Sequence, residues 1–417
     1  MIFVAAWRYW WLLRRERWKR WRPTQAAWDR VHGKTGAAIY RLATRLGGAF
    51  VKLGQVLGAR ADVMPPAFVA PLRGLHDRVP ARPLDELRDH VEHELGKPLD
   101  EVFAHVEPTA IAAASLAQVH RATLRDGTDV VIKIQYPEAR RLFPIDLASL
   151  RRAIRVARWL NRGLDLRALV DELAEFVKLE LEFEREAVST ARIRENLASD
   201  PSVVVPTVHV ATGKLLVLGF LSGTPLSAIE RLREREIDLR DLARRVAALY
   251  ATMIFEHGFF HGDPHPGNIL VLDDGRIGLL DFGLAKELPP GFGAAAAKMI
   301  ASAMAGNTAA AVEAARSIGF VIADDLVPEL LGLVRTLLGD YQHAGQLLQN
   351  MRRGRLEVPS HFTLIIRVLV ILSGVSHTLV PGERVIGGAL AAGLARAVVP
   401  PSGGRRAEGA ITSPKPQ

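Results

Sequence analysis

Residues 260–270, "FHGDPHPGNIL", place an Asp and an Asn five residues apart in one short loop. Two prolines and a glycine separate Asp263 from Asn268 and leave the backbone between them little freedom. This rigid spacing predicts that the two side chains converge on one ligand. His261 and His265 have no third soft ligand nearby in the sequence, so we interpret His261 as a structural residue that holds the loop.

A β-hairpin that carries a second Asp follows this loop. Residues 270–283 read "LVLDDGRIGLLDFG", two apolar runs joined by a D-G pair, which is a strong hairpin signal. Asp281 comes directly after the second run, eighteen residues after Asp263. This spacing is typical of phosphoryl-transfer sites, in which the first Asp orients or deprotonates a hydroxyl group or water. Asn268 and Asp281 would then bind Mg²⁺, which prefers oxygen ligands and is completed by phosphates and waters.

Lys133 is the candidate phosphate-binding lysine. It stands in "VVIKIQ", an apolar run whose alternation predicts a strand and which resembles the "VAIK" strand of protein kinases. A buried ammonium group requires a counter-charge, so a partner carboxylate is expected. The alternative is a lysine on an edge strand that points into solvent.

The order of helical and strand patterns predicts two lobes. Residues 24–105 have a helical pattern, and strand patterns follow over 111–134 and again over 202–221. Helical patterns fill most of 138–199 and most of the chain after residue 225. A small β-rich lobe with a helical insertion, followed by a helical lobe, is the arrangement of a two-lobed nucleotide-dependent phosphotransferase with its ligand between the lobes.

We expect five segments along the chain. They are a Trp/Arg-rich terminus, a helical extension, the β-rich lobe, the helical lobe with the catalytic loop, and a disordered tail, at residues 1–23, 24–108, 109–220, 221–398 and 399–417. The tail is rich in Pro, Gly and Ser, a composition that does not support a packed core.

The composition excludes several classes of function. The 417 residues are 49% hydrophobic and include no cysteine, which removes disulfides, thiolate metal sites and cysteine nucleophiles. The net charge is +9, but residues 1–22 hold seven basic residues against one acid, so the rest of the chain is nearly balanced. Neither a broad basic face nor a zinc-finger spacing is present in the sequence, and we expect no nucleic-acid partner.

The N-terminal segment has the composition of a membrane-surface anchor. Six of the seven tryptophans lie in residues 1–28, and four of them share a helical face that Arg14 interrupts. Tryptophan rings at headgroup depth and guanidinium groups on lipid phosphates suit an anionic surface. The apolar run precedes the positive charges, which is the reverse of a secretory signal. The alternative is a helix packed on the protein's own surface.

Two later apolar runs favour buried helices over membrane spans. Residues 362–375 and 385–399 are shorter than a spanning helix and carry Arg367 and Arg396. We therefore expect both runs to belong to the helical lobe.

Two further motifs narrow the class of phosphotransferase. "AAASLAQVHRA" (112–122) stands where protein kinases carry a glycine-rich loop, and "FVKLGQVLGARADVMPPAFVAPLRGLHDRVP" (50–80) lies upstream of it. With "HGDPHPGN" and "DFG" in the same order, the chain resembles the UbiB/AarF atypical kinase-like family over roughly residues 30–395. The resemblance implies an α+β fold, namely an atypical two-lobed protein-kinase-like fold with an N-terminal helical K-x-G-Q extension.

The resemblance also implies two regulatory motifs. Lys52 and Gln55 of the K-x-G-Q helix would lie across the active site, where they inhibit protein phosphorylation and support an ATPase-like activity. Glu180 and Glu182 correspond to an E-x-D motif, with Glu182 in place of the usual Asp. The alternative for these acids is a solvated helix face.

The nucleotide contacts follow from the same resemblance. Glu186 matches the glutamate that pairs with Lys133. The nucleotide would contact the Ala-rich loop and the backbone of the hinge, at Ala112, Ala113, Ala114, Ser115, Leu218 and Phe220.

The expected function is that of an atypical kinase-like, Mg²⁺-dependent ATPase that binds ATP or ADP and supports isoprenoid-quinone biosynthesis of the ubiquinone type. It would be cytoplasmic and peripheral on the inner face of the membrane, with an anionic lipid surface, a lipid or quinone precursor and quinone-biosynthesis proteins as partners. The sequence after "DFG" lacks an activation segment and an A-P-E motif, which argues against a peptide substrate. The alternatives are a small-molecule kinase of aminoglycoside or choline-kinase type and a catalytically weak nucleotide-binding scaffold.

Overall fold

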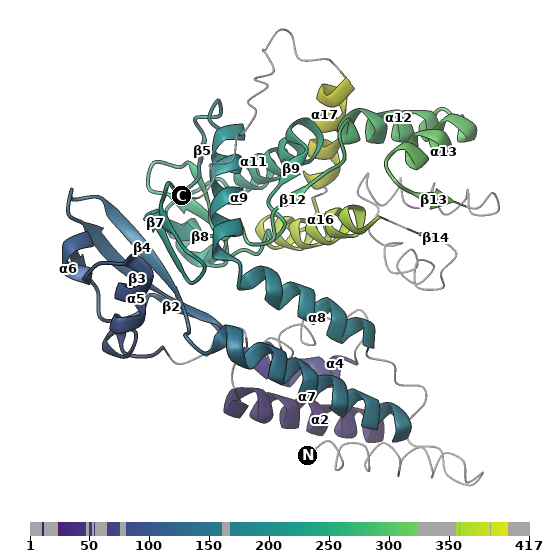
Figure 1. Cartoon of the computed structure of the whole chain (residues 1–417). Helices are drawn as coiled ribbons and strands as arrows, with labels where there is room; N and C mark the ends of the chain where they lie inside the picture. Colours follow the sequence, from purple (N-terminus) through teal and green to yellow (C-terminus); the bar gives the residue numbers. More distant parts are fainter. Residues whose placement is uncertain are drawn as a thin grey trace, which may run out of the picture. The chain divides into compact units, whose positions relative to one another are not determined.

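In the computed structural model the chain forms two compact units (Figure 1). The first comprises Met1–Leu232 and His265–Ala285, and the second comprises Arg233–Pro264 and Lys286–Gln417. The structure describes Trp11 and residues 24–46, 50–51, 54, 65–75, 81–160, 167–322, 356–357, 359–383 and 385–398. The disordered tail expected over 399–417, and all of the N-terminal anchor except Trp11, lie outside the described residues.

A six-stranded antiparallel sheet forms the centre of the first unit, in the order β1-β3-β4-β7-β6 with β2 paired to β3. Its strands are β1 (Phe103–Val106), β2 (Ala112–Ala113), β3 (Ala117–Leu124), β4 (Asp129–Gln135), β6 (Val208–Ala211) and β7 (Leu215–Gly219). Gly127, at φ +87°, occupies the D-G turn between β3 and β4. Strand β1 falls in the stretch expected to be helical. It is extended because buried Phe103 begins a ladder with β3.

Two-residue alternation gives the two faces of this sheet different cores. One face packs in a cluster with helix α8 (Arg167–Glu180). Its members include Val130, Ile132, Ile134, Leu173, Val177, Leu215 and Val217. The other face packs with helix α9 (Phe183–Asn196), and its buried members are Ala117, Phe183, Ala187, Leu216 and Leu218. Lys133 alternates with Ile132 and Ile134, so it shares the α9 face of β4.

A second sheet in the first unit, ordered β5-β11-β10-β8, contains the hairpin that follows the "HGDPHPGN" loop. Strand β10 (Ile269–Leu272) pairs antiparallel with β11 (Ile277–Leu279) and with β8 (Gly223–Pro225), and β11 pairs in parallel with β5 (Val203–Val204). Residues 265–285 belong to the first unit, whereas the sequence patterns assign them to the helical lobe.

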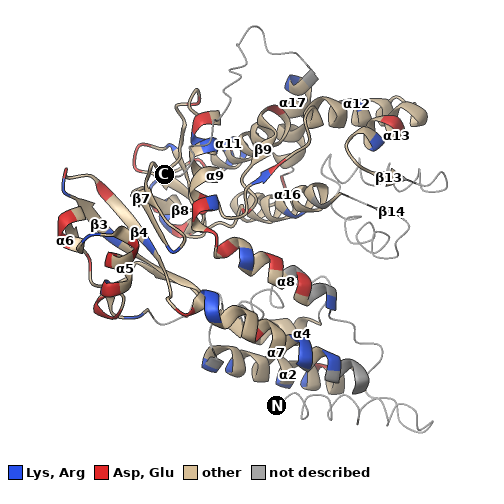
Figure 2. Ribbon diagram, in the orientation of Figure 1, with Lys and Arg blue, Asp and Glu red and all other residues tan. Residues whose placement is uncertain are grey.

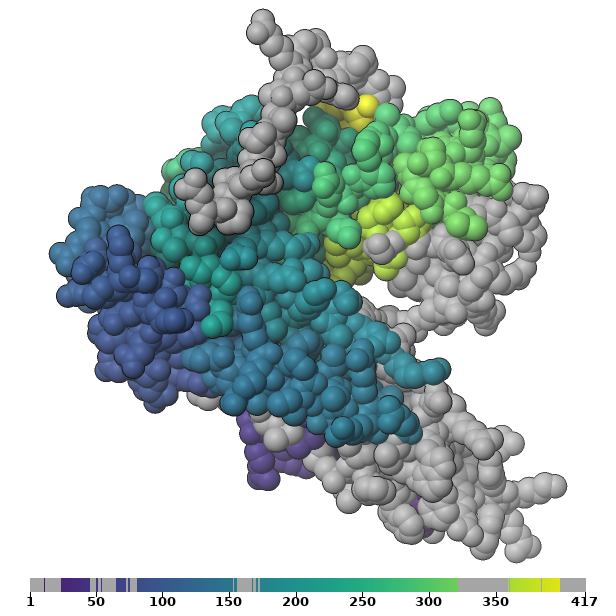
Figure 3. Space-filling view, in the orientation of Figure 1, coloured from purple at the N-terminus to yellow at the C-terminus, as the bar shows by residue number. Residues whose placement is uncertain are grey.

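Long helices are inserted between β4 and β6. Helix α7 (Ala139–Leu160) is followed by α8 and α9, and Arg151 of α7 forms an ion pair with Asp171 of α8 at 2.8 Å. Figure 2 shows basic residues near the start of α7 and again in its second half, and mixed charges along α8. Figure 3 shows the side chains of α7 and α8 as a continuous part of the surface in this view.

The helical extension packs through glycine. It contains α2 (Gln25–Leu46), α4 (Pro66–Val69) and η1 (Ala70–Leu75). A Cβ atom on Gly36 would lie 2.2 Å from the carbonyl oxygen of Phe68, so α2 approaches α4 at a distance that only glycine permits. Shorter elements lead from there to β1, namely η2 (Leu84–Glu86), α5 (Arg88–Leu95) and α6 (Leu99–Val102).

The second unit is mainly helical. After α10 (Ile229–Glu234), which spans the boundary between the units, its elements are α11 (Leu239–Thr252), the π-turn η3 (Met253–His257), β9 (Phe259–Phe260), β12 (Lys286–Glu287), α12 (Phe292–Met304), α13 (Thr308–Ser317), β13 (Val321–Ile322), β14 (Leu356–Glu357), α16 (Ser360–Leu379) and α17 (Val385–Val398). Helix α16 extends beyond both ends of the apolar run 362–375 that predicted it. Among the described residues, His361–Leu379 alone is long and apolar enough to cross a membrane, and half of this window is buried within the protein.

Candidate active site

Lys133 of β4 forms an ion pair with Glu186 of α9. The Nζ atom lies 2.9 Å from Oε1 and 2.7 Å from Oε2 of Glu186. The Glu186 side chain is 3% exposed and that of Lys133 is 22% exposed. Strand β4 has a paired strand on each side, so Lys133 does not lie at a sheet edge. The structure therefore brings together the lysine and the carboxylate that the sequence singled out.

The charge of Lys133 is stabilised by more than one carboxylate. Burial acts to lower the pKa of Lys133, but the charges of Asp281 and Glu186 outweigh it and raise the pKa above the ordinary lysine value. Glu180 adds a weaker effect in the same direction. The ammonium group thus stays protonated and faces a region of negative charge, which suits a phosphate only if a cation offsets the excess of carboxylates.

Asn268 and Asp281 lie at the same end of the β10–β11 hairpin. Ile269 pairs with Leu279, and the N–H of Leu280 donates to the carbonyl of Asn268 at 2.9 Å. The residues just before β10 and just after β11 are therefore neighbours. Asp281 has φ +60°, a left-handed conformation that residues other than glycine rarely adopt, and its Oδ1 accepts a bond from Gly283 N–H at 3.3 Å.

The residues present fit a magnesium ion. An amide and a carboxylate at one hairpin end supply the oxygen donors that Mg²⁺ prefers. Within the described part of the chain, no group of three or more His, Cys, Asp or Glu side chains could hold a metal alone. A metal at Asn268 and Asp281 would need further oxygen ligands, which the phosphates of a nucleotide and water can provide.

Asp263 belongs to the second unit, close to two buried residues of that unit. The Tyr250 hydroxyl and His261 Nδ1 are joined by a hydrogen bond of 2.7 Å, and both residues are fully buried. Burial and the Asp263 carboxylate raise the pKa of Tyr250 well above its ordinary value, so its hydroxyl group stays protonated. His261 therefore has the structural position expected of it, anchored to helix α11.

The Ala-rich segment forms a tight hairpin between β2 and β3. The N–H of Ala114 donates to the carbonyl of Ala117 at 2.8 Å, and Ala112 pairs with Val119. Ala112 and Ala114 are exposed, Ala113 is half-buried and Ser115 is buried. Alanine Cβ atoms on the exposed residues limit how closely a phosphate can approach this backbone.

A polar network around the buried residues Gln118 and His120 of β3 was not predicted from the sequence. The N–H of Arg82 donates to Gln118 Oε1 and Gln118 Nε2 donates to the Arg82 carbonyl, both at 2.9 Å. His120, also on β3, bonds through Nδ1 to the carbonyl of Glu107 at 2.8 Å. The sequence feature that could have indicated this network is the pair Gln118 and His120, two polar residues at alternating positions of an apolar strand. The network ties Arg82 and Glu107, which precede the Ala-rich turn, to β3, which follows it.

The hinge residues are only partly open to a nucleotide. Leu218 lies in β7, which is paired on both sides with β4 and β6. The N–H of Phe220 donates to the carbonyl of Asp129 at 2.9 Å, and its ring lies 4.4 Å from the Arg121 guanidinium carbon. The Phe220 N–H is thus already used within the protein, so it cannot also donate to an adenine ring.

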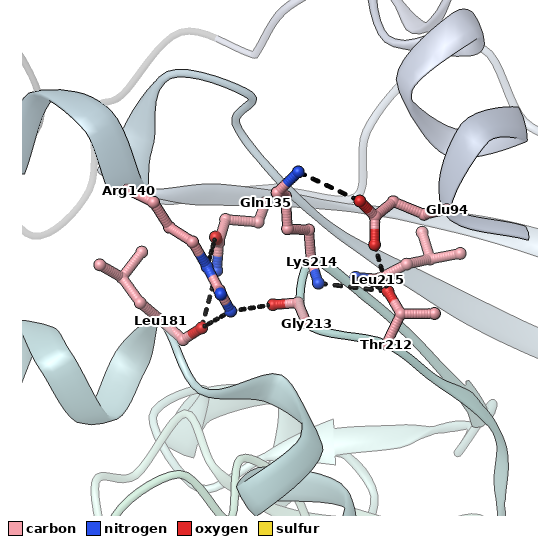
Figure 4. Close-up of polar contacts among 8 residues, drawn as sticks. All are labelled: Glu94, Gln135, Arg140, Leu181, Thr212, Gly213, Lys214 and Leu215. Carbon is pink, nitrogen blue, oxygen red and sulfur yellow. Dashed lines mark hydrogen bonds and ion pairs between the residues drawn. The ribbon is translucent and has the colours of Figure 1, made fainter. Parts of the chain in front are cut away.

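Glu180 and Glu182 flank the break between α8 and α9. Figure 4 shows that the residue between them, Leu181, is held through its carbonyl by two side chains. Arg140 Nη2 donates to this carbonyl at 2.8 Å and Gln135 Nε2 donates to it at 3.2 Å. The Arg140 side chain also donates to Gln135 Oε1 at 2.9 Å and to the carbonyl of Gly213. These contacts fix the backbone that carries the two acids.

An ion pair holds the β6–β7 turn to α5 in the same region. Lys214 Nζ lies 3.1 Å from Glu94 Oε1, and the Thr212 hydroxyl donates to Glu94 Oε2 at 2.7 Å (Figure 4). The sequence patterns did not single out Arg140, Gln135 or Glu94, because their partners are backbone groups or residues distant in sequence.

Lys52 and Gln55 lie outside the described residues, and their roles stay predictions. Between them, Gly54 is described. A Cβ atom on Gly54 would lie 2.1 Å from Cδ1 of Leu75, so the glycine of the K-x-G-Q motif packs directly against η1.

Similarity to known proteins assigns the family. A family model, the ABC1 atypical kinase-like domain, matches residues 74–315, more than half of the chain. The chain belongs to the ABC1 atypical kinase-like family. AarF domain-containing protein kinase 1 of Xenopus tropicalis is 32% identical over 271 residues, which are 63% of this chain and 52% of that protein. These similarities confirm the predicted UbiB/AarF membership.

Two further relatives extend the comparison. The protein sll0005 of Synechocystis sp. is 29% identical over 86% of this chain, and this chain spans 56% of its length. ACTIVITY OF BC1 COMPLEX KINASE 8, chloroplastic, of Arabidopsis thaliana is 36% identical over 59% of this chain and 33% of that protein. The chain thus spans about a third to somewhat over half of these relatives.

A solved structure agrees with the fold of this ABC1 chain. The complex of Rv3197 with erythromycin from Mycobacterium tuberculosis matches with a TM-score of 0.55 and 25% identity, over 81% of this chain and 90% of that one. Together with the family match, this similarity confirms the α+β, kinase-like fold predicted from the sequence.

Proposed function

We propose that this chain is an atypical kinase-like ATPase that depends on Mg²⁺ and assists isoprenoid-quinone biosynthesis of the ubiquinone type. One observation carries the proposal. The Lys133–Glu186 pair occurs in the same unit as the oxygen donors Asn268 and Asp281, and the Asp281 charge acts on Lys133. A lysine for phosphate and two oxygen ligands for a metal are the parts that phosphoryl transfer requires.

Each residue has a stated task in this proposal. Lys133 binds phosphate oxygens of ATP or ADP, and Glu186 holds its ammonium group in position. Asn268 and Asp281 would hold magnesium, which when bound neutralises charge on the phosphates. Asp263 orients the attacking water or hydroxyl group or accepts its proton.

Water or a small molecule is favoured as phosphate acceptor over a protein. Only residues 284–291 separate Gly283 of the "DFG" motif from the start of α12 at Phe292. Protein kinases place the peptide platform in a much longer segment after this motif. We assign Lys52 and Gln55 the role of suppressing protein phosphorylation in favour of ATP hydrolysis.

The membrane enters the proposal through residues 1–23. Their tryptophans and arginines suit a peripheral site on the anionic inner face of the membrane, near a lipid or quinone precursor and quinone-biosynthesis proteins. Deletion of residues 1–22 should abolish co-sedimentation with anionic liposomes. Unchanged sedimentation would refute the proposal that residues 1–23 anchor the protein to the membrane. The proposal for the nucleotide site would not be affected by that result.

Quinone profiling of a deletion strain tests the function. Complementation with the wild-type chain should restore the quinone, whereas Asp281→Asn, produced at the same level, should not, because the variant lacks the proposed metal-binding carboxylate. Full restoration by Asp281→Asn would contradict an enzymatic role and favour the scaffold alternative.

A second candidate function is small-molecule phosphorylation, which the erythromycin complex of Rv3197 favours. Erythromycin carries hydroxyl groups, the acceptor that a kinase-type site uses. Incubation with γ-labelled ATP and either erythromycin or an aminoglycoside separates the candidates. Label on the small molecule would support this function, and label released only as free phosphate would support the ATPase.

A further inference from the structure

Helix α9 contacts the loop after Asp281 through Arg185, the residue directly before Glu186. The Arg185 guanidinium donates from Nη1 to the carbonyl of Gly283 and from Nη2 to the carbonyl of Ala285, both at 3.1 Å. Arg185 is half-buried, and its two bonds span the backbone that follows Asp281. A planar guanidinium with donors in fixed directions suits two such acceptors better than a lysine ammonium does.

The peptide groups of Gly283 link this contact to the metal-binding carboxylate. The Gly283 N–H donates to Asp281 Oδ1 at 3.3 Å, while its carbonyl accepts from Arg185. A Cβ atom at Gly283 would lie 3.4 Å from Asp281 Oδ1 and 3.8 Å from Glu186 Oε2. The loop therefore passes close to both carboxylates, and fixing the Gly283 backbone limits how the Asp281 side chain can rotate.

The backbone of Asp281 needs such support. A residue with a Cβ atom at φ +60° persists only where surrounding contacts determine its conformation. Two other described contacts act on neighbouring residues, because Phe282 is fully buried and the N–H of Leu280 donates to Asn268. Arg185 supplies a third contact, with the carbonyls of Gly283 and Ala285, which follow Phe282 in the chain.

We propose that Arg185 is a positioning residue for the Asp281 carboxylate, and that α9 sets the phosphate lysine and the metal ligand together through its adjacent residues Arg185 and Glu186. The inference rests on the proposed function, because that function assigns Asp281 to Mg²⁺. A displacement of α9 would loosen Lys133 and Asp281 at the same time, so this helix acts on nucleotide and metal as one element.

The test measures how strongly nucleotide binding depends on Mg²⁺ in the full chain. The probe is N-methylanthraniloyl-ADP, titrated with Mg²⁺ and, in a parallel series, in EDTA. Arg185→Ala should raise the Mg²⁺ concentration at half-saturation about tenfold, a size typical when a group that orients a metal ligand is lost. Binding in EDTA should stay at the wild-type value. Arg185→Lys should give an intermediate Mg²⁺ dependence, because it keeps the charge without the two fixed donors.

A matched control and a reference variant make each outcome decisive. Glu184→Ala removes an exposed charge from the adjacent position of α9 and should match the wild type. If Asp281→Asn loses the Mg²⁺ dependence while Arg185→Ala keeps it, the inference about Arg185 is overturned and the proposed function stands. Equal weakening of Arg185→Ala with and without Mg²⁺ would also overturn it, since that is the result of a general structural role.

Two further outcomes complete the test. Wild-type Mg²⁺ dependence in Asp281→Asn would mean that this carboxylate does not hold the metal, and both proposals would fail. If Arg185→Ala does not fold, Arg185→Lys carries the same comparison, and a half-saturation concentration equal to wild type would refute the inference.

Discussion

Replacement of Glu186 by Gln should destabilise the protein through the lysine that it leaves behind. The substitution keeps the size of the side chain and removes the charge that Lys133 Nζ meets at 2.7 Å. Breaking a buried ion pair by changing one partner typically costs about 3–5 kcal/mol, against about 0–1 kcal/mol for an exposed pair. Lys133 is 22% exposed and keeps the Asp281 charge nearby, so the lower end applies. We expect the free energy of unfolding to fall by about 3 kcal/mol.

A double-mutant cycle measures this coupling. Urea unfolding, followed by circular dichroism, would compare Glu186→Gln, Lys133→Met and the two combined. Each single variant leaves a buried group without its partner, whereas the double variant leaves neither, so it should be more stable than the sum of the single losses predicts. The pKa of Lys133 is raised in the folded protein, so its stabilising contribution is complete below the ordinary lysine value of 10.5 and is lost only as the pH rises beyond that value. Measurement at neutral pH therefore captures all of it.

Strictly additive losses in this cycle would contradict a coupling between Glu186 and Lys133. Additivity would mean that the two side chains act independently, despite two contacts below 3 Å. A fall of less than about 1 kcal/mol for Glu186→Gln would place the pair among exposed ion pairs and would equally contradict its burial.

Three other predictions concern the rest of the structure. Gly293→Ala should lower the free energy of unfolding by about 2–3 kcal/mol, because its Cβ atom would lie 1.9 Å from the carbonyl oxygen of Phe255. Gly374→Ala should raise the free energy of unfolding by about 0.5–1 kcal/mol, because its Cβ atom would meet nothing within 4 Å and alanine favours the helix. Burial lowers the pKa of His361, so as the pH drops the unfolded chain takes up a proton at this residue before the folded protein does, and the free energy of unfolding falls below pH 6.5. In His361→Phe the free energy of unfolding should fall less steeply with decreasing pH. The same steepness in the variant and the wild type would contradict this. Arg140→Ala should speed amide hydrogen exchange roughly tenfold at the α8–α9 break around Leu181, and unchanged exchange there would refute the clamp.

The sequence predicted the parts of the site that depend on local pattern. The "HGDPHPGN" loop and the D-G hairpin place Asn268 and Asp281 correctly at one hairpin end, because strand alternation and turn chemistry are local properties. The pairing of Lys133 with Glu186 spans 53 residues of sequence, and it was expected only because a buried lysine demands a carboxylate and the family resemblance indicates which one.

Contacts with backbone groups could not be predicted in this way. Arg185 binds carbonyls 98 and 100 residues away, and carbonyls leave no mark in the sequence, so the sequence patterns did not single out Arg185. The same limit applies to Phe220, whose backbone was expected to contact adenine and whose N–H donates to the carbonyl of Asp129. The four-residue strand β1 was missed because a short run beside helical patterns gains its conformation from its partner strand β3.

The decisive measurement of the proposed ATPase is the release of inorganic phosphate from ATP by the full chain, compared between the wild type and Asp281→Asn. Release should require Mg²⁺ in the wild type and fall to the background rate in the variant, with the fold of the variant verified by circular dichroism. Equal Mg²⁺-dependent release from both proteins would contradict it.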